Sequence, residues 1–270
     1  MKSFRAARQL GGAGGFACRA ILSYLQTLTR TLGVYIGAVA RTLTSAECSL
    51  RSSTSKITFS PCSTPSTITL EHLTSLAGPG PVAAEITAFD HVSGRLFVAN
   101  ATFRTVDVYD MKDPAVPEKI ATIDLSSFGS SVNSVAAYGG VVAMAVQGPL
   151  KTDPGTIVFY RATTLHQVSS VTVGALPDMV TFTPDGQTVL VANEGEPNDA
   201  YTVDPEGSVS VIDVHNINAP LARTASFGRY NGQEDDLRAA GIRIFGPDAS
   251  AAQDFEPEYI TTDDAGPSPT

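Results

Sequence analysis

An internal repeat with a period of 46 residues runs through the chain. Turn glycines stand at Gly94, Gly140 and Gly186, and a short run of apolar and β-branched residues lies on either side of each. Two further runs of this kind complete every unit. Such runs, bounded by Gly, Pro, Asn or Asp, predict β-strands. The expected strands are 86–90, 95–100, 105–110 and 118–125 in the first unit, 134–138, 141–146, 156–160 and 166–173 in the second, and 179–183, 188–193, 208–213 and 221–227 in the third.

Four strands per unit at this spacing are the signature of a β-propeller of the WD40/YVTN-like kind, in which each unit is one blade. The second run of every unit is almost continuously apolar, as in a strand buried on both faces. A β-sandwich of twelve strands is the alternative, and the constant period argues against it. Helical content is expected to be low, and the best helix candidate is the stretch 234–240. A fourth unit would begin with a strand at 256–266, so we expect an all-β fold of about three blades plus the start of a fourth, a fragment of a larger ring.

Charge divides the chain into two parts. Residues 1–63 hold 8 Lys/Arg and one acid, and residues 64–270 hold 10 Lys/Arg and 26 acids, which together give the net charge of −9. This split predicts a basic, Ser/Thr-rich arm or targeting segment, disordered, followed by a partial propeller over 64–270. The arm resembles an organelle transit peptide; a secretory signal or a mis-started gene model are the alternatives. Arg30 interrupts its apolar stretch, so membrane attachment is not supported.

The sequence contains no set of residues arranged for catalysis. The G-x-S-x-G nucleophile elbow and the G-x-x-x-x-G-K-[ST] phosphate loop are absent, and no two of the four histidines stand at a metal-ligand interval. All three cysteines lie in the basic arm, without metal spacing. The acidic balance argues against a nucleic-acid partner. These observations leave catalytic activity open and assign no catalytic residue.

Strand direction places the acidic residues of the third unit on one side of the fold. In a four-stranded meander the second and fourth strands run the same way, so loops 194–207 and 228–255 share a face. Carboxylates with amide oxygens nearby suit a hard cation such as Ca²⁺, the one cofactor that the sequence suggests. The spacing is not that of an EF-hand, and a solvated acidic loop is the alternative. The candidate ligands are Asn193, Glu194, Glu196, Asn198, Asp199, Asp204 and Glu206.

Five long motifs in and after the third unit are GALPDMVTFTPDG (174–186), VANEGEPND (191–199), DPEGSVSVID (204–213), LRAAGIRIFG (237–246) and EPEYI (256–260). Together they resemble the choice-of-anchor I family. Its members are also known as mesenchyme-specific cell-surface glycoprotein-like proteins, and some bacterial members carry an alkaline phosphatase label. The resemblance covers roughly residues 67–262. It implies a larger propeller, commonly of seven blades, and an extracellular or cell-surface location.

Two functions from different classes follow. The first is a non-enzymatic extracellular or cell-surface propeller that binds a protein or glycan through its acidic loop face. The alternative, which the resemblance implies, is a calcium-dependent phosphoester hydrolase of the atypical alkaline phosphatase type, in which a bound metal would activate water. The scarcity of Lys and Arg in the acidic loops favours binding, because such a face repels phosphate. Asn100 opens an Asn-Ala-Thr sequon and is the expected glycosylation site.

Overall fold

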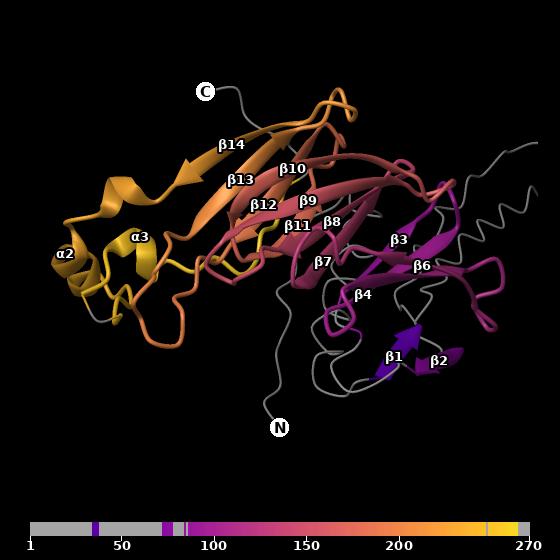
Figure 1. Cartoon of the computed structure of the whole chain (residues 1–270), viewed down its shortest axis with the longest axis horizontal. Coiled ribbons are helices and arrows are strands. Elements are labelled where there is room, and N and C mark those ends of the chain that lie inside the picture. The colour runs from indigo at the N-terminus through magenta and orange to yellow at the C-terminus, as the bar shows by residue number, and fades with distance from the viewer. Residues whose placement is uncertain (1–33, 38–71, 78–83, 85, 247, 264–270) are drawn as a thin grey trace, which may run out of the picture.

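Three four-stranded antiparallel sheets form the body of the computed structural model, which describes residues 34–37, 72–77, 84, 86–246 and 248–263 (Figure 1). Every sheet is a meander of four consecutive strands, as in a propeller blade. The propeller prediction is therefore confirmed, and the two packed sheets of a sandwich are not what the chain forms. The strands are β3 (Thr87–Asp90), β4 (Arg95–Asn100), β5 (Thr105–Asp110) and β6 (Glu118–Asp124) in the first blade; β7 (Ser131–Tyr138), β8 (Val141–Gln147), β9 (Pro154–Arg161) and β10 (Gln167–Ala175) in the second; and β11 (Pro177–Phe182), β12 (Thr188–Asn193), β13 (Ser208–Asp213) and β14 (Leu221–Ser226) in the third.

A few small elements accompany the blades. β1 (Val34–Gly37) pairs with β2 (Thr74–Ala77), and the connection after β14 carries a 3₁₀ turn, η1 (Gly228–Tyr230), and two short helices, α2 (Glu234–Ala239) and α3 (Ala251–Asp254). α2 confirms the helix expected around 234–240. Among the helices of the described residues, none is both long and apolar enough to span a bilayer.

The strand predicted at 256–266 is wrong over residues 256–263, which adopt no regular structure. A strand needs a hydrogen-bonded neighbour, and Ile260 instead directs its backbone N–H to Met179 Sδ, 3.1 Å away on β11. The arm predicted over residues 1–63 lies outside the described residues apart from Val34–Gly37, as does its boundary with the folded part, so its predicted disorder stays a prediction. The larger, seven-bladed ring stays a prediction.

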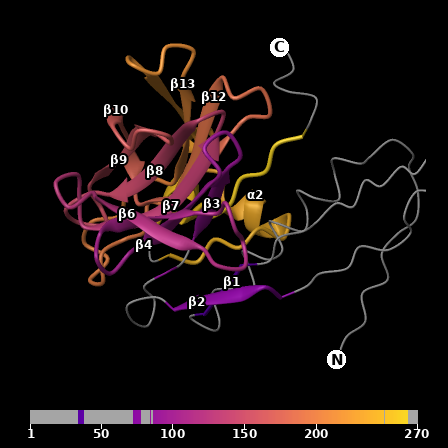
Figure 2. The same ribbon diagram turned by 90° about the vertical axis from the view of Figure 1, so that its right-hand side faces the viewer.

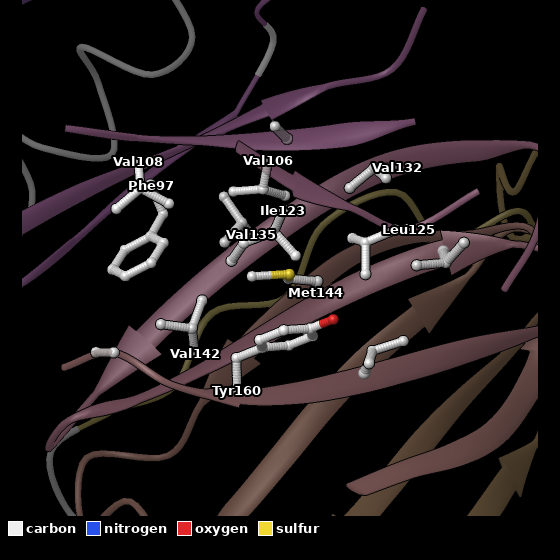
Figure 3. Packing of buried hydrophobic residues seen from close by; sticks show 14 residues of the cluster. Phe97, Val106, Val108, Ile123, Leu125, Val132, Val135, Val142, Met144 and Tyr160 are labelled. Carbon is white, nitrogen blue, oxygen red and sulfur yellow. The ribbon is translucent and has the colours of Figure 1, made fainter. Parts of the chain in front are cut away.

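Apolar strands bury the faces on which neighbouring blades meet, and the three sheets fan out side by side (Figure 2). Between the first and second blades, Phe97 and Val106 pack with Met144 and Tyr160 (Figure 3). Between the second and third, Phe159 joins a second cluster with residues of β12 and β13. Alternate side chains of β8 enter opposite clusters, which explains why its sequence, VVAMAV, is apolar without interruption.

Polar contacts tie each blade to the next. The carboxylate of Asp90, which is fully buried, accepts hydrogen bonds from the backbone N–H groups of Ser93 (2.8 Å) and Gly140 (3.0 Å), the second of which is in the neighbouring blade. Burial acts to raise the pKa of Asp90, but the hydrogen bonds outweigh it and hold the pKa below its usual value. One blade further on, the Tyr138 hydroxyl donates to the Pro184 carbonyl (2.9 Å). A buried and a half-buried hydrogen bond therefore help to fix how the blades sit against each other.

Asp90→Ala is expected to lower the free energy of unfolding by about 2 kcal/mol, because it leaves the buried N–H of Gly140 and the half-buried N–H of Ser93 without their hydrogen-bond acceptor. The measurement is thermal or urea unfolding of the full chain. Asp113→Ala is the matched control: Asp113 Oδ1 accepts only an exposed hydrogen bond from Ala115 N within its own turn. Its loss is expected to cost about 0.5 kcal/mol. Equal effects of the two substitutions would contradict a bridging role for Asp90.

Candidate functional site

The connections that follow the second and fourth strands of the blades meet on one side of the molecule, here called the loop face. Direct contacts join its two longest members, 194–207 and 227–255. Gly207 N donates to Ala252 O (2.9 Å), and Gln253 Nε2 donates to Asp204 O (2.8 Å). The shared face predicted from strand direction is therefore confirmed. The loop face consists of residues 101–104, 125–130, 148–153, 194–207 and 227–263.

Close backbone packing fixes the segment after α3 against loop 194–207. A Cβ on Gly207 would overlap the carbonyl of Phe255, so only glycine fits at this position. The Phe255 ring lies edge-on to Phe227, with ring centroids 5.5 Å apart, and contacts Tyr230 at 6.0 Å. From there the chain turns back along the third blade and passes β11 (Figure 1). This course carries residues 256–260 to the carboxylates that follow β12.

A cluster of carboxylates surrounds Glu194. This residue directly follows the buried end of β12, and its backbone N–H donates to Leu176 O (2.9 Å). Its side chain is half-buried. Burial, and then the negative charges of four other carboxylates, raise the pKa of Glu194 to about 8. A group with that pKa holds its proton near neutral pH. The other members of the carboxylate cluster are Asp178 on β11, Glu196, Glu256 and Glu258.

A lysine of the second blade reaches this cluster. Lys151, in the loop after β8, places Nζ 3.2 Å from Glu196 Oε2 and 3.8 Å from Asp199 Oδ1. Burial and the charge of Glu196, followed by other carboxylates, raise the pKa of Glu256, and Lys151 opposes that rise. Lys151 therefore offsets part of the negative charge at Glu196 and Glu256.

The seven predicted calcium ligands have different surroundings. Glu194 and Glu196 belong to the carboxylate cluster, and Asp199 extends into solvent beside Lys151. Burial and the charge of Asp254 raise the pKa of Asp204, whose Oδ1 is buried without a hydrogen-bond partner.

The remaining three candidate ligands, Asn193, Asn198 and Glu206, make hydrogen bonds within the fold. Asn193 is fully buried; its Nδ2 donates to the hydroxyls of Ser208 and Ser210, while its Oδ1 has no partner. Asn198 Oδ1 accepts from the backbone N–H of Thr202 (2.9 Å), which shapes the loop. Glu206 accepts from Asn231 Nδ2 (3.2 Å). Among the described residues there is no group of three or more His, Cys, Asp or Glu side chains placed to hold a metal ion. Calcium binding stays a prediction.

Asn100, the predicted glycosylation site, ends β4 and is only 3% exposed. Its side-chain oxygen accepts a long hydrogen bond of 3.4 Å from Phe103 N. A glycan must leave its asparagine into solvent, and this amide does not face solvent. The burial of Asn100 in the folded chain therefore does not support its glycosylation.

Exposed apolar side chains are the feature of the loop face that sequence reasoning missed. Leu150, Tyr201, Val203 and Tyr259 are between 50% and 64% exposed. Phe103, Ile242 and Phe245 bring the loop face to 7 of the 12 large hydrophobic residues that are exposed in the described part of the chain. The signal was present in the sequence, as apolar residues within Gly-, Pro- and Asp-rich connections. Such gathering is typical of surfaces that bind a partner.

A hollow of about 530 Å³ lies in the connection after β14. Glu234, Asp235, Asp236 and Asp248 contribute to its lining, together with Arg238. The arginine is used locally: Nη1 lies 2.9 Å from Asp235 Oδ1, and Nε donates to Ile244 O. Its lining contains no histidine or cysteine, and Ser250 Oγ serves the cap of α3. The hollow offers acceptors for a polar ligand but no paired nucleophile and base.

Comparison with known proteins gives one family. The model of the Choice-of-anchor I domain matches residues 85–268. A curated relative, the Mesenchyme-specific cell surface glycoprotein of Strongylocentrotus purpuratus, is 30% identical over 136 residues, which cover 46% of this chain and 17% of that protein. The chain thus spans less than a fifth of the relative's length.

Solved structures resemble the chain in part. Hydrazine synthase of Kuenenia stuttgartiensis has 20% sequence identity and a TM-score of 0.44, covering 57% of this chain and 40% of its own. The WD40 domain of Neurospora crassa Pan2 has 11% identity and a TM-score of 0.42, covering 57% and 43%. Neither likeness bears on what this chain binds.

Proposed function

This chain belongs to the choice-of-anchor I domain family, and from that premise we propose that it is a non-enzymatic module of an extracellular or cell-surface protein that binds a protein ligand through its loop face. The named relative is a cell surface glycoprotein, which supports the location. A glycan is the other ligand class, and the same experiment tests it.

The observation that carries the proposal is the gathering of exposed apolar side chains on the loop face. Leu150, Tyr201 and Val203 lie on two loops that Lys151 holds together through Glu196. Burying large apolar groups of this kind is what stabilises protein complexes, and tyrosine is enriched where binding energy concentrates. Aliphatic side chains such as Leu150 and Val203 favour a protein over a glycan, which prefers aromatic platforms. The hydrolase alternative has no comparable observation among the described residues.

The test is a binding screen of the full chain against arrays of extracellular proteins and of glycans. A Leu150→Ser, Tyr201→Ser double variant is expected to lose at least tenfold in affinity for the selected ligand, because two anchoring side chains together contribute about 2 kcal/mol or more. The matched control is Val92→Ser, Val116→Ser, which removes two exposed apolar residues from turns on the opposite side.

A phosphomonoester assay with millimolar calcium accompanies the screen. Turnover that disappears in the loop-face variant would overturn the binding proposal in favour of the hydrolase. Equal loss of binding in the two double variants would show that the loop face is not the site. A calcium-dependent rise in Tm of the parent would support the predicted cation site.

A further inference from the structure

An asparagine followed by a glycine lies in the connection after β14, at Asn231 and Gly232. Both residues are exposed, and Gly232 has a left-handed backbone (φ 80°) with open space where a Cβ would lie. The side chain of Asn231 joins two parts of the loop face. Its Nδ2 donates to Glu206 Oε1 (3.2 Å) in loop 194–207, and its Oδ1 accepts from Ala252 N (2.9 Å) in α3. The state of this amide therefore bears on how the loop face is held together.

The backbone nitrogen of Gly232 is a nucleophile for the side-chain carbonyl of Asn231, because joining the two closes a five-membered ring. Gly232 N donates to Glu234 Oε1 (2.9 Å), so a carboxylate stands where the proton of this nitrogen must leave. The hydrogen bond from Ala252 N polarises the side-chain carbonyl of Asn231, as a donor in an oxyanion hole does. Because glycine has no Cβ, nothing on Gly232 shields the nitrogen. These contacts favour ring closure.

One rotation separates the folded chain from ring closure. Asn231 has a ψ of 136°, which turns Gly232 N away from the Cγ atom of Asn231. Closure therefore requires a turn about the Cα–C bond of Asn231. This residue lies between η1 and α2, outside regular secondary structure, and the glycine that follows accepts a wide range of backbone angles. The rate of closure is set by how often this short segment turns.

We propose that Asn231 is a deamidation site and that its conversion loosens loop 194–207 from the connection after β14. A bond forms between Gly232 N and Asn231 Cγ, the Cγ–Nδ2 bond breaks, and ammonia leaves with the proton that Glu234 takes from Gly232 N. Water then opens the ring: its hydroxyl joins one ring carbonyl carbon and its other hydrogen returns to the nitrogen, which gives aspartate or isoaspartate. The hollow lined by Gly232 and Glu234 admits that water. The inference goes beyond the proposed function and does not rest on it.

Deamidation changes the contact between position 231 and loop 194–207. A carboxylate at this position no longer donates to Glu206, and the two carboxylates repel each other across the 3.2 Å that the hydrogen bond now spans. An aspartate there still accepts from Ala252 N, so its contact with α3 remains. The loop is therefore loosened at Glu206 while α3 stays in place.

The experiment incubates the full chain at physiological temperature and pH and follows each asparagine by peptide mass spectrometry, with isoaspartate detected by enzymatic methylation. Asn231 is expected to deamidate faster than Asn218, an exposed asparagine between β13 and β14 that precedes an alanine. Glu234→Gln is expected to slow the reaction at Asn231 about tenfold or more, because glutamine still accepts from Gly232 N but does not take its proton.

Asn231→Asp tests the consequence without the reaction. Its Tm is expected to lie several degrees below that of the parent, and the amide of Gly207 is expected to exchange faster with solvent. Asn218→Asp, which makes the same change of charge between β13 and β14, is the matched control and is expected to keep the Tm of the parent.

Each part of the inference has its own contrary result. Equal rates at Asn231 and Asn218 in the parent would overturn the deamidation site. An unchanged rate in Glu234→Gln would overturn the role of that carboxylate as the base. Equal Tm values in the two Asn→Asp variants would overturn the loosening of loop 194–207. None of these measurements uses a ligand, so their failure is separate from that of the binding proposal.

Discussion

Gly207→Ala is expected to lower the free energy of unfolding by about 3 kcal/mol, the upper end of what overpacking costs. The new methyl group would overlap the carbonyl of Phe255, and backbone on both sides has to move to make room. The aromatic contacts of Phe255 with Phe227 and Tyr230 are then lost together. For a chain of this size such a loss lowers Tm by about 6–12 °C.

Hydrogen exchange shows whether the destabilisation by Gly207→Ala is centred on the segment around Phe255. Amides of residues 251–260 are expected to exchange faster in Gly207→Ala, while those of β8 and β9 stay protected. Gly228→Ala is the control in the same connection, because its Cβ would meet only the Ser226 hydroxyl at 3.2 Å and two side-chain atoms at 3.9 Å. A similar fall in the free energy of unfolding in Gly207→Ala and Gly228→Ala would contradict this expectation. It would mean that the connection as a whole, and not the close approach at Gly207, determines the stability.

Glu194→Gln is expected to raise Tm by several degrees at about pH 8.5 and to leave it unchanged at about pH 4.5. The pKa of Glu194 rises from its usual 4.5 to about 8 on folding. Between these values the folded state holds a proton that the unfolded chain does not, so stability falls as pH rises. Above about pH 8 the carboxylate is ionised in both states, and the folded protein bears its repulsion with Asp178 and Glu196. Glutamine removes that repulsion.

The measurement is Tm against pH for the parent, Glu194→Gln and Glu118→Gln, the matched control, which makes the same change of charge on exposed β6 away from the loop face. Glu256 and Asp204, whose pKa values are also raised, contribute a slope of the same sign in all three proteins. Only the difference between the parent and Glu194→Gln therefore reports on Glu194. A difference that is constant across the pH range would contradict the assignment.

The blades could be predicted because their signal is local and repeated. The runs 95–100, 105–110, 188–193 and 208–213 are strands with those same bounds, since Gly, Asn or Asp residues mark their ends. Other strands extend beyond the predicted runs; β7 begins at Ser131, because its polar residues pair with β8 through a register shift. The expected strand after residue 255 was wrong because composition shows which residues suit a strand but not whether a partner strand is present.

The candidate site could be predicted only in outline. Strand direction placed loops 194–207 and 228–255 on one face, and the structure joins them through Gly207 and Gln253. Proximity in the sequence suggested that Asn193 and Glu206 act with Glu194, and this stays a prediction. The side-chain amide of Asn193 donates a hydrogen bond to Ser210 on β13, and the carboxylate of Glu206 accepts one from Asn231. No pattern in the sequence indicates that residues 256–258 return to Glu194, because that contact depends on the course of the chain after α3.

The contacts between blades also bear on how the chain folds as it is synthesised. Val180 N donates to Ser134 Oγ and the Tyr138 hydroxyl to Pro184 O, and each bond joins residues 46 positions apart, one repeat length. Each of these blades thus contacts the blade that directly precedes it in the sequence, which the ribosome has already synthesised. Loop closure over such a short span costs little and need not await the rest of the chain. Assembly can proceed blade by blade from the N-terminal side, each new blade covering the apolar face that the previous one leaves open.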